Sequence, residues 1–263
     1  MLLGYHRNDF KQYGGLKVPL SITLSKKTSS VLIAGKSGSG KSTAGLWYSW
    51  QMLSSNESRV YLADYKGGFE YEAFEGLPSY ASGDDAIKMI RDFYDFFTAV
   101  RDNRYRLKHH HTLFIEEYFG LLSYAEARDK KLKNELMSKV GEMLAVSRGL
   151  DIGIFLCVQR ADSSNFSAGA REQFQCVLSF GRCSAEQFRM LGFSSELEEN
   201  PTGSYKAGGA LALIDGQEGV QEILVPRIKN VDDMYRGIRY YLDRQPDIPS
   251  LTRAVAGGGR TGQ

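Results

Sequence analysis

The sequence predicts an α/β fold in which a mainly parallel sheet is flanked by helices on both faces, with a C-terminal β-hairpin. Two observations lead to this prediction. Between residues 30 and 245, short apolar runs typical of buried strands alternate with longer segments of helical period. Towards the end of this region, the apolar runs Ala210–Ile214 and Val220–Val225 flank the turn dipeptide Asp215-Gly216, as in a hairpin.

The first strand, Ser30–Ala34, leads directly into a loop, Gly35–Ser42, that fits the pattern G-x-x-x-x-G-K-[ST] at every position. A helix over Ser42–Leu53 follows, so the context indicates a P-loop rather than a chance glycine-rich turn. Backbone N–H groups and the helix N-terminus would face phosphate oxygens. Lys41 would contact the β- and γ-phosphates of ATP, and the Ser42 hydroxyl would hold Mg²⁺. The expected nucleotide-binding residues are Gly35, Lys36, Ser37, Gly38, Ser39, Gly40, Lys41, Ser42 and Thr43.

Along the chain we expect three segments. Residues 1–29 form an N-terminal edge segment, in which Leu16–Leu24 alternates loosely and Pro19 favours an edge strand. Residues 30–245 form the ATPase domain, and the residues from 246 to 263, which become Gly-rich, form a disordered tail. Inside the domain, strands are predicted at Arg59–Ala63, Thr112–Ile115, Ile152–Val158 and Cys176–Phe180, and helices at Asp84–Lys108, Glu126–Ser147 and Val231–Arg244.

Composition limits the location and the partners. The 263 residues suit one large α/β domain or two small ones, and the net charge of +2 excludes a globally basic nucleic-acid coat. No apolar run is long enough to span a membrane, and charged residues come too early for a signal peptide. The cysteines Cys157, Cys176 and Cys183 are odd in number and fit buried thiols. We therefore expect a cytoplasmic protein, which a partner could recruit to the membrane.

Polar residues follow two of the predicted strands. The run Leu113–Ile115 ends in Glu116 and Glu117, which downstream of a P-loop indicates a Walker B element rather than two exposed acids. Glu116 would hold Mg²⁺, and Glu117 would orient the attacking water. Gln159 follows the strand after that and either contacts the γ-phosphate or is an ordinary loop residue. Because ligands bind outside the carboxyl ends of strands in open α/β sheets, we expect Gln159 to share the site.

Basic residues gather near the end of the long helix that precedes Walker B. Arg101, Arg104 and Arg106 lie there, and by themselves they indicate a solvated helix face. His109–His111 follow, but three adjacent side chains point in different directions, so a polar loop is a better interpretation than a metal site.

Taken together, the motifs resemble those of the FtsK/SpoIIIE branch of the FtsK–HerA ATPases over roughly residues 25–230. This resemblance implies a RecA-like P-loop NTPase fold and a ring of subunits, with Arg104 as a catalytic arginine finger that acts on the neighbouring subunit. The segments that carry it are Ile33–Ser42 (Walker A), Asp64-Tyr65-Lys66-Gly67-Gly68 (the D-x-K turn), Asn103–Leu107 (E-R-R-Y-x-L), Ile115–Leu122 (V-D-E-F-A-D-L-M) and Ser147–Arg160 (R-A-x-G-I-H-L-x-x-A-T-Q-R).

Three positions depart from the family pattern: Glu116 replaces Asp, Asn103 replaces the first Arg, and Ala161 replaces the Pro after Gln-Arg. The segment between Tyr105 and Walker B is also short. We expect a bare motor domain from a conjugative system or another mobile element, without a membrane segment or a winged-helix module for reading DNA.

The leading functional hypothesis is an ATPase that translocates DNA as a ring, which we expect to be a homohexamer. Its catalytic residues would be Lys41, Glu117, Gln159 and Arg104, its cofactor Mg²⁺, and its partner DNA, contacted at phosphates without regard to sequence. Lys66–Phe69 and Ser163–Arg171 are the candidate pore segments, or else ordinary βα loops. A type VII secretion-like ATPase or coupling protein that acts on a polypeptide is the alternative. A non-hydrolysing scaffold and a small-molecule kinase fit the residues less well.

Overall fold

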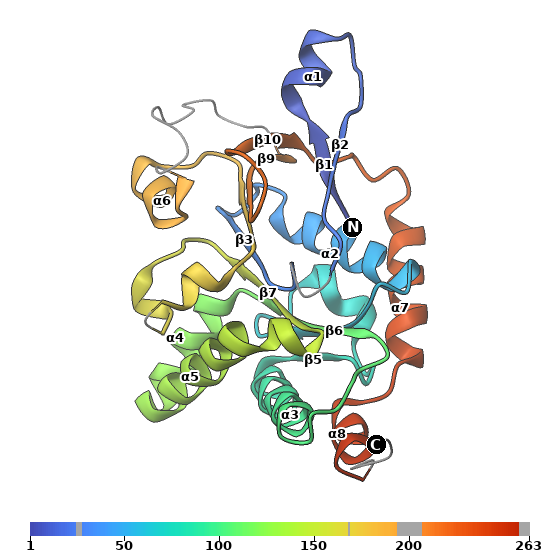
Figure 1. Cartoon of the computed structure of the whole chain (residues 1–263), viewed down its shortest axis with the longest axis vertical. Coiled ribbons are helices and arrows are strands. Elements are labelled where there is room, and N and C mark those ends of the chain that lie inside the picture. Colours follow the sequence, from blue (N-terminus) through green and yellow to red (C-terminus); the bar gives the residue numbers. More distant parts are fainter. Residues whose placement is uncertain (25–27, 168, 194–206, 258–263) are drawn as a thin grey trace.

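The structure, a computed structural model, describes residues 1–24, 28–167, 169–193 and 207–257 (Figure 1). The described strands form one sheet in the order β2-β1-β10-β9-β8-β3-β7-β6-β4-β5. These strands are β1 (Leu2–His6), β2 (Pro19–Ser21), β3 (Val31–Gly35), β4 (Ser58–Asp64), β5 (Tyr80–Ser82), β6 (His110–Glu116), β7 (Ile152–Val158), β8 (Cys176–Phe180), β9 (Gly209–Ile214) and β10 (Gln221–Leu224).

Six adjacent strands, from β8 to β5 in the sheet order, run parallel, and the remaining neighbours pair antiparallel. The prediction of a mainly parallel sheet with a C-terminal hairpin is therefore confirmed, and β9 and β10 are that hairpin. All residues of β6 and β7 are buried, as expected for strands covered on both faces. Since the central strands are parallel, the residues that follow β3, β4, β6 and β7 meet at one edge of the sheet.

Helices cover both faces of the sheet, and β3 shows how one strand serves both layers. Val31 and Ile33 pack into the core on the side of α2 and α7, whereas Leu32 and Ala34 pack into the core on the side of α3, α4 and α5. The helices are α1 (Arg7–Gln12), α2 (Lys41–Ser54), α3 (Gly83–Asp102), α4 (Tyr118–Arg128), α5 (Lys130–Val146), α6 (Ala185–Met190), α7 (Val231–Arg244) and α8 (Ile248–Gly257), with 3₁₀ turns η1 (Phe69–Phe74), η2 (Ser147–Leu150), η3 (Ser163–Asn165) and η4 (Ala170–Gln173).

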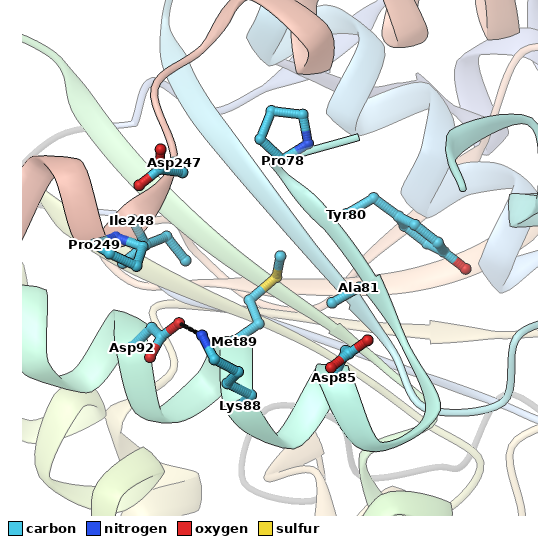
Figure 2. Close-up of a pocket in the computed structure, with 10 residues that line it drawn as sticks. All are labelled: Pro78, Tyr80, Ala81, Asp85, Lys88, Met89, Asp92, Asp247, Ile248 and Pro249. Atoms are coloured by element: carbon cyan, nitrogen blue, oxygen red, sulfur yellow. Dashed lines mark hydrogen bonds and ion pairs between the residues drawn. The ribbon is translucent and has the colours of Figure 1, made fainter. Parts of the chain in front are cut away.

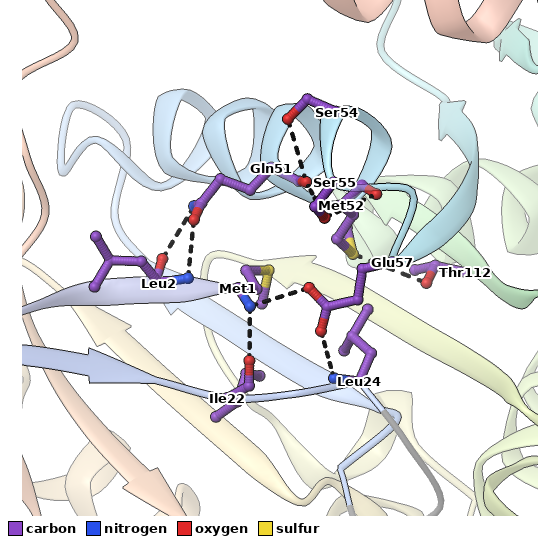
Figure 3. A network of polar contacts seen from close by, with 10 residues as sticks. All are labelled: Met1, Leu2, Ile22, Leu24, Gln51, Met52, Ser54, Ser55, Glu57 and Thr112. Atoms are coloured by element: carbon purple, nitrogen blue, oxygen red, sulfur yellow. Dashed lines mark hydrogen bonds and ion pairs between the residues drawn. The ribbon is translucent and has the colours of Figure 1, made fainter.

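The N-terminal residues extend the same sheet instead of forming a separate layer. β2, which contains Pro19, lies at the edge of the sheet, as predicted. Gln51 of α2 donates to Leu2 O (3.0 Å) and accepts from Leu2 N (2.8 Å), and Glu57 accepts from Leu24 N (2.7 Å) (Figure 3). These contacts fix the first strands to the helix that follows the P-loop.

Two predicted helices have different bounds in the structure. The helix expected to reach Lys108 ends at Asp102, because Arg104 has a left-handed backbone (φ 51°) and Tyr105 N donates back to Val100 O (2.9 Å). The helix expected over Glu126–Ser147 is two helices, α4 and α5, that meet at Asp129. The backbone of Asp129 is extended, and its carboxylate accepts from Lys131 N (2.8 Å), which caps α5.

The polar loop predicted for the histidine run holds for His109, which precedes β6, but is wrong for the two histidines after it. His110 and His111 begin β6 and are both buried. Burial lowers the pKa of His110 to about 4 and that of His111 to about 3, so both rings are neutral near pH 7. His110 Nδ1 lies 3.0 Å from the Ser58 hydroxyl, which gives this ring a partner between neighbouring strands.

The expectation of a disordered tail from residue 246 is wrong as far as residue 257, and the rest of that tail lies outside the described residues. α8 occupies this segment because Ile248, Leu251 and Val255 form an apolar stripe that packs against α3 (Figure 1). Asp247 caps the helix by accepting from Ser250 N (2.7 Å). Figure 2 shows Ile248 and Pro249 beside Met89 of α3, in a hollow of about 360 Å³ that Asp85, Asp92 and Asp247 also line.

No helix in the described ranges combines the length and the apolar character that a bilayer crossing requires.

The close approach of β7 to the preceding segment gives a test of this packing. A Cβ added at Gly153 would lie 2.0 Å from the carbonyl oxygen of Ser29, whereas a Cβ at Gly149 would meet nothing within 4 Å. We expect Gly153→Ala to lower the free energy of unfolding by about 1–3 kcal/mol, because the backbone must move. Gly149→Ala is the matched control and should leave stability unchanged. Denaturant unfolding curves measure the difference. Equal midpoints for the two variants would contradict the close approach of Gly153 to Ser29.

Candidate active site

The loop between β3 and α2 has a backbone that only glycine accommodates at several positions. Gly38 and Gly40 have positive φ angles of 77° and 91°. A Cβ at Gly35 would lie 2.7 Å from the Ser39 hydroxyl and 2.9 Å from the carbonyl oxygen of Phe180. Gly40 precedes the first residue of α2, so the unpaired N–H groups of that helix open onto the loop. This is an anion-binding geometry made by backbone.

A pocket of about 430 Å³ lies over this loop. It joins the P-loop to the residues that follow three other parallel strands, β4, β6 and β7. The predicted site residues Ser42, Glu116, Glu117 and Gln159 all reach it, as does Lys41. Its lining residues are Lys36, Ser37, Gly38, Ser39, Gly40, Lys41, Ser42, Thr43, Lys66, Glu70, Glu116, Glu117, Gln159 and Ala207.

Lys41 makes an ion pair inside this pocket. Its Nζ donates to Glu117 Oε1 at 2.8 Å, and its side chain is only 6% exposed. Burial alone would lower the pKa of Lys41, but the hydrogen bond to Glu117 and the negative charges of Glu116 and Glu117 outweigh it and raise that pKa. Lys41 is therefore charged and oriented, and its ammonium group is paired with the carboxylate of Glu117.

Glu116 and Ser42, the two predicted Mg²⁺ ligands, lie in direct contact. The Ser42 hydroxyl donates to Glu116 Oε1 at 2.6 Å, so the longer glutamate spans the gap to the loop. Glu116 Oε2 is buried and has no hydrogen-bond partner among the described residues. Burial raises the pKa of Glu116, and the neighbouring Cys157 thiol and the hydrogen bond from Ser42 oppose that shift. An unpartnered carboxylate oxygen beside a hydroxyl is the hard oxygen donor set that Mg²⁺ prefers, so these residues fit the ion.

Glu117 turns into the pocket because its backbone is left-handed (φ 50°) at the start of α4. For a residue with a Cβ this conformation costs about 1–2 kcal/mol. Its second carboxylate oxygen accepts from Gln159 Nε2 at 3.1 Å. Lys41, Glu117 and Gln159, which come from three different strand–helix junctions, are thus joined by consecutive hydrogen bonds.

Sequence reasoning missed two residues that line the pocket, Lys66 and Glu70. Both belong to the loop after β4, whose shape depends on Asp64. The Asp64 carboxylate accepts from Lys66 N (3.1 Å) and Gly68 N (2.9 Å), which folds the loop back towards the P-loop. The signal available in the sequence was the acid at a strand end followed by two glycines.

Arg104 is not part of this pocket. α3 connects β5 to β6, which run parallel, so its last residues return to the opposite, amino-terminal edge of the sheet. Arg104 is exposed there, and its side chain contacts no residue of the site. Of the candidate pore segments, Lys66–Phe69 lies at the pocket. In Ser163–Arg171, the Arg171 guanidinium donates to two backbone carbonyls, Ala161 O and Met190 O, both at 3.0 Å.

The sequence profile of the FtsK/SpoIIIE family matches residues 9–162, more than half of the chain. The protein belongs to the FtsK/SpoIIIE family. Its P-loop is therefore that of a family of ATPases, and the resemblance that its motifs indicate is confirmed. No curated protein sequence matches it.

Solved structures similar to this FtsK/SpoIIIE-family ATPase share its fold at low sequence identity. EssC (ATPases 2 and 3) of Geobacillus thermodenitrificans aligns with a TM-score of 0.67 at 12% identity, over 97% of this chain and 49% of that one. The pCW3 conjugation coupling protein TcpA, in monomer form with ATPγS, aligns with 0.66 at 18%, over 90% and 69%. The genome packaging NTPase B204 of Sulfolobus turreted icosahedral virus 2, with ATPγS, aligns with 0.52 at 14%, over 76% and 98%. The chain thus spans about half the length of the solved EssC chain, which contains ATPases 2 and 3.

The two glutamates should give different defects when each is changed to glutamine. Glu117→Gln should keep ATP bound and slow hydrolysis about 10²–10⁴-fold, because it removes the carboxylate that can accept a proton. It should also tighten ATPγS binding, since Lys41 loses its ion-pair partner. Glu116→Gln should instead raise the Mg²⁺ concentration needed for half-maximal turnover. Measurements of turnover, ATPγS binding and Mg²⁺ dependence distinguish the variants. If Glu116→Gln trapped ATP and Glu117→Gln raised the Mg²⁺ requirement, the roles of the two glutamates would be reversed.

Proposed function

We propose that this ATPase is a motor that translocates DNA and works as a homohexameric ring. The observation that carries the proposal is the division of its charged groups between two edges of the sheet. Lys41, Glu116 and Glu117 gather at the carboxyl edge, while Arg104 lies exposed at the amino edge. A head-to-tail contact between two copies would bring the two sets together, and a contact of this kind repeats around a ring.

Inside one subunit, the ion pair of Lys41 with Glu117 defines the resting arrangement. When bound, Mg²⁺ would neutralise charge on phosphate oxygens, and Ser42 and Glu116 are the residues that would hold it. Lys41 must leave Glu117 to contact those oxygens. Glu117 then has a free carboxylate oxygen with which to accept a proton from water, while Gln159 fixes the other oxygen. The movement of Lys41 from Glu117 to the phosphate oxygens would therefore both bind the nucleotide and free Glu117 to act as the base.

Two of the similar structures support DNA as the partner. The B204 structure, a genome packaging NTPase, is covered over 98% of its length, and TcpA is a conjugation coupling protein. A role in conjugation or in another mobile element fits both. With a net charge of only +2, one subunit can make few phosphate contacts. A ring would gather the contacts of several subunits around its pore.

A secretion motor that acts on a polypeptide is the second candidate, supported by the similarity to EssC over 97% of this chain. A membrane-bound partner would fit either role. The connected Lys41, Glu117 and Gln159 argue against a non-hydrolysing scaffold, because such a protein has no need of an oriented base.

DNA-stimulated turnover tests the choice of partner. We expect double-stranded DNA of any sequence to raise the ATPase rate several-fold, and the stimulation to fall as salt is increased, because counterions compete for the phosphates. Lys41→Ala, which lacks the phosphate-binding cation, should show no turnover under any condition. An ATPase rate that is unchanged by DNA but rises with a secretion substrate peptide would favour the polypeptide motor.

Arg104 should act on the nucleotide held by a neighbouring subunit. A guanidinium supplied across an interface is typically worth about 10³–10⁵ in turnover. We expect Arg104→Gly to bind ATPγS normally and lose hydrolysis even with DNA, while glycine relieves the left-handed backbone and so keeps the helix end intact. Mixing Arg104→Gly with Lys41→Ala subunits should restore part of the activity, because some interfaces are then complete.

Arg101→Ala is the matched control for this experiment. Arg101 is tied to Asp102 and Glu142 within the same chain, so its loss should not abolish turnover. Full DNA-stimulated activity of Arg104→Gly on its own would make Arg104 an ordinary surface residue.

A further inference from the structure

We propose that Phe69 inserts into an apolar hollow at the amino edge of a second copy of this chain, and that this contact brings the second copy's Arg104 to the nucleotide pocket. The inference rests on the proposed action of Arg104 across a subunit interface. It assigns the two surfaces that meet there, and it gives Phe69 a partner other than the pore.

Phe69 is exposed to an extent that folding of the single chain does not explain. Its side chain is 93% exposed, whereas Tyr71 and Phe74 in the same turn are buried. Leaving a phenyl ring in water forgoes about 1.5–3 kcal/mol of burial free energy. The position is nonetheless fixed, because Asp64 holds the loop before it and Glu70 after it lines the nucleotide pocket. An exposed ring on a loop whose backbone is held beside a ligand site indicates a contact with another molecule.

The hollow lies at the opposite edge of the sheet, between the end of α3, the start of β6 and α8. Its volume is about 130 Å³, and about 150 Å³ of apolar space is known to hold a benzene ring. One aromatic side chain is therefore the right size for it. The apolar side chains that line it are Phe96, Tyr105, Leu107, Leu251, Ala254 and Val255.

Opposite charges surround the two surfaces. Phe69 is followed by Glu70 and Glu72, and neither side chain makes a hydrogen bond or ion pair within the described part of the chain. Arg59 and Lys108 line the hollow, with Arg104 and Arg106 adjacent in sequence, and these four side chains also lack partners among the described residues. The acids that follow the ring and the bases around the hollow favour a second copy as the occupant, since complementary charge guides and orients such contacts.

The positions of the surfaces connect this contact to catalysis. Phe69 stands between Lys66 and Glu70, which line the pocket that contains Lys41. Tyr105 lines the hollow and is the residue next to Arg104. A ring seated in the hollow therefore places the arginine of one copy close to the nucleotide site of the other. Because the two surfaces lie on opposite edges of the sheet, the contact is head-to-tail and can close into a ring.

Assembly in ATPγS, measured by sedimentation without DNA, tests the contact. We expect Phe69→Asp to bind ATPγS as a monomer, to fail to assemble, and to lose hydrolysis as Arg104→Gly does. Tyr240→Asp is the control, because Tyr240 on α7 is another aromatic residue, 52% exposed, and lines neither the nucleotide pocket nor the hollow. If Phe69→Asp assembled normally and lost only its DNA stimulation, Phe69 would be a pore residue and this proposal would be wrong.

A disulfide experiment locates the partner surface directly. Phe69→Cys subunits mixed with Leu251→Cys subunits should form cross-linked dimers in ATPγS under oxidation, and the native cysteines, which are all buried, should not interfere. Tyr240→Cys mixed with Leu251→Cys should give none. Absence of the cross-link in assembled rings would overturn the contact but leave the ring motor standing. Failure of the native protein to assemble, together with failure of the Arg104 and Lys41 mixing experiment, would overturn both.

Discussion

The ion pair between Lys41 and Glu117 is the interaction on which the active site depends. It joins the P-loop after β3 to the acid after β6, and Gln159 extends it to the end of β7. Parallel strands are what bring these three chain positions together, since their carboxyl ends share one edge. The sheet topology thus determines which side chains can meet, and the left-handed backbone at Glu117 determines that one of them points inward.

Charge balance in the pocket explains why this arrangement is stable before nucleotide arrives. Lys41 is buried between two glutamates, and an unpaired buried ammonium would cost several kcal/mol. Its partner, Glu117, is also the proposed base, so in that proposal the base stays paired with Lys41 until phosphate oxygens take its place beside the ammonium group. A site built this way avoids holding an unopposed carboxylate beside an incoming polyphosphate.

The parts of the fold that the sequence predicted are those determined by local pattern. The bounds of β7, β8 and α7 follow from continuous apolar runs and from a helix stopped before Pro246. The P-loop, Glu116, Glu117 and Gln159 were predictable because a motif and the parallel order fix their edge of the sheet. α8 was missed because its apolar stripe is short and glycines follow it. Lys66 and Glu70 were not assigned to the nucleotide site, because the D-x-K turn indicates a bend after β4 but not the hydrogen bonds of Asp64 that fold this loop towards the P-loop.

The end of α3 shows how a local feature of backbone can serve assembly. A helix between two parallel strands must finish at the edge opposite the P-loop, so Arg104 cannot reach the nucleotide of its own subunit whatever its rotamer. The helix closes with a left-handed residue at the position where glycine is the usual choice, and here that residue is an arginine. In the proposed ring, the guanidinium at this position would act on the nucleotide of the neighbouring subunit. Hydrolysis would then depend on a correctly placed neighbour, and the chemical step of each subunit would be coupled to the geometry of the ring.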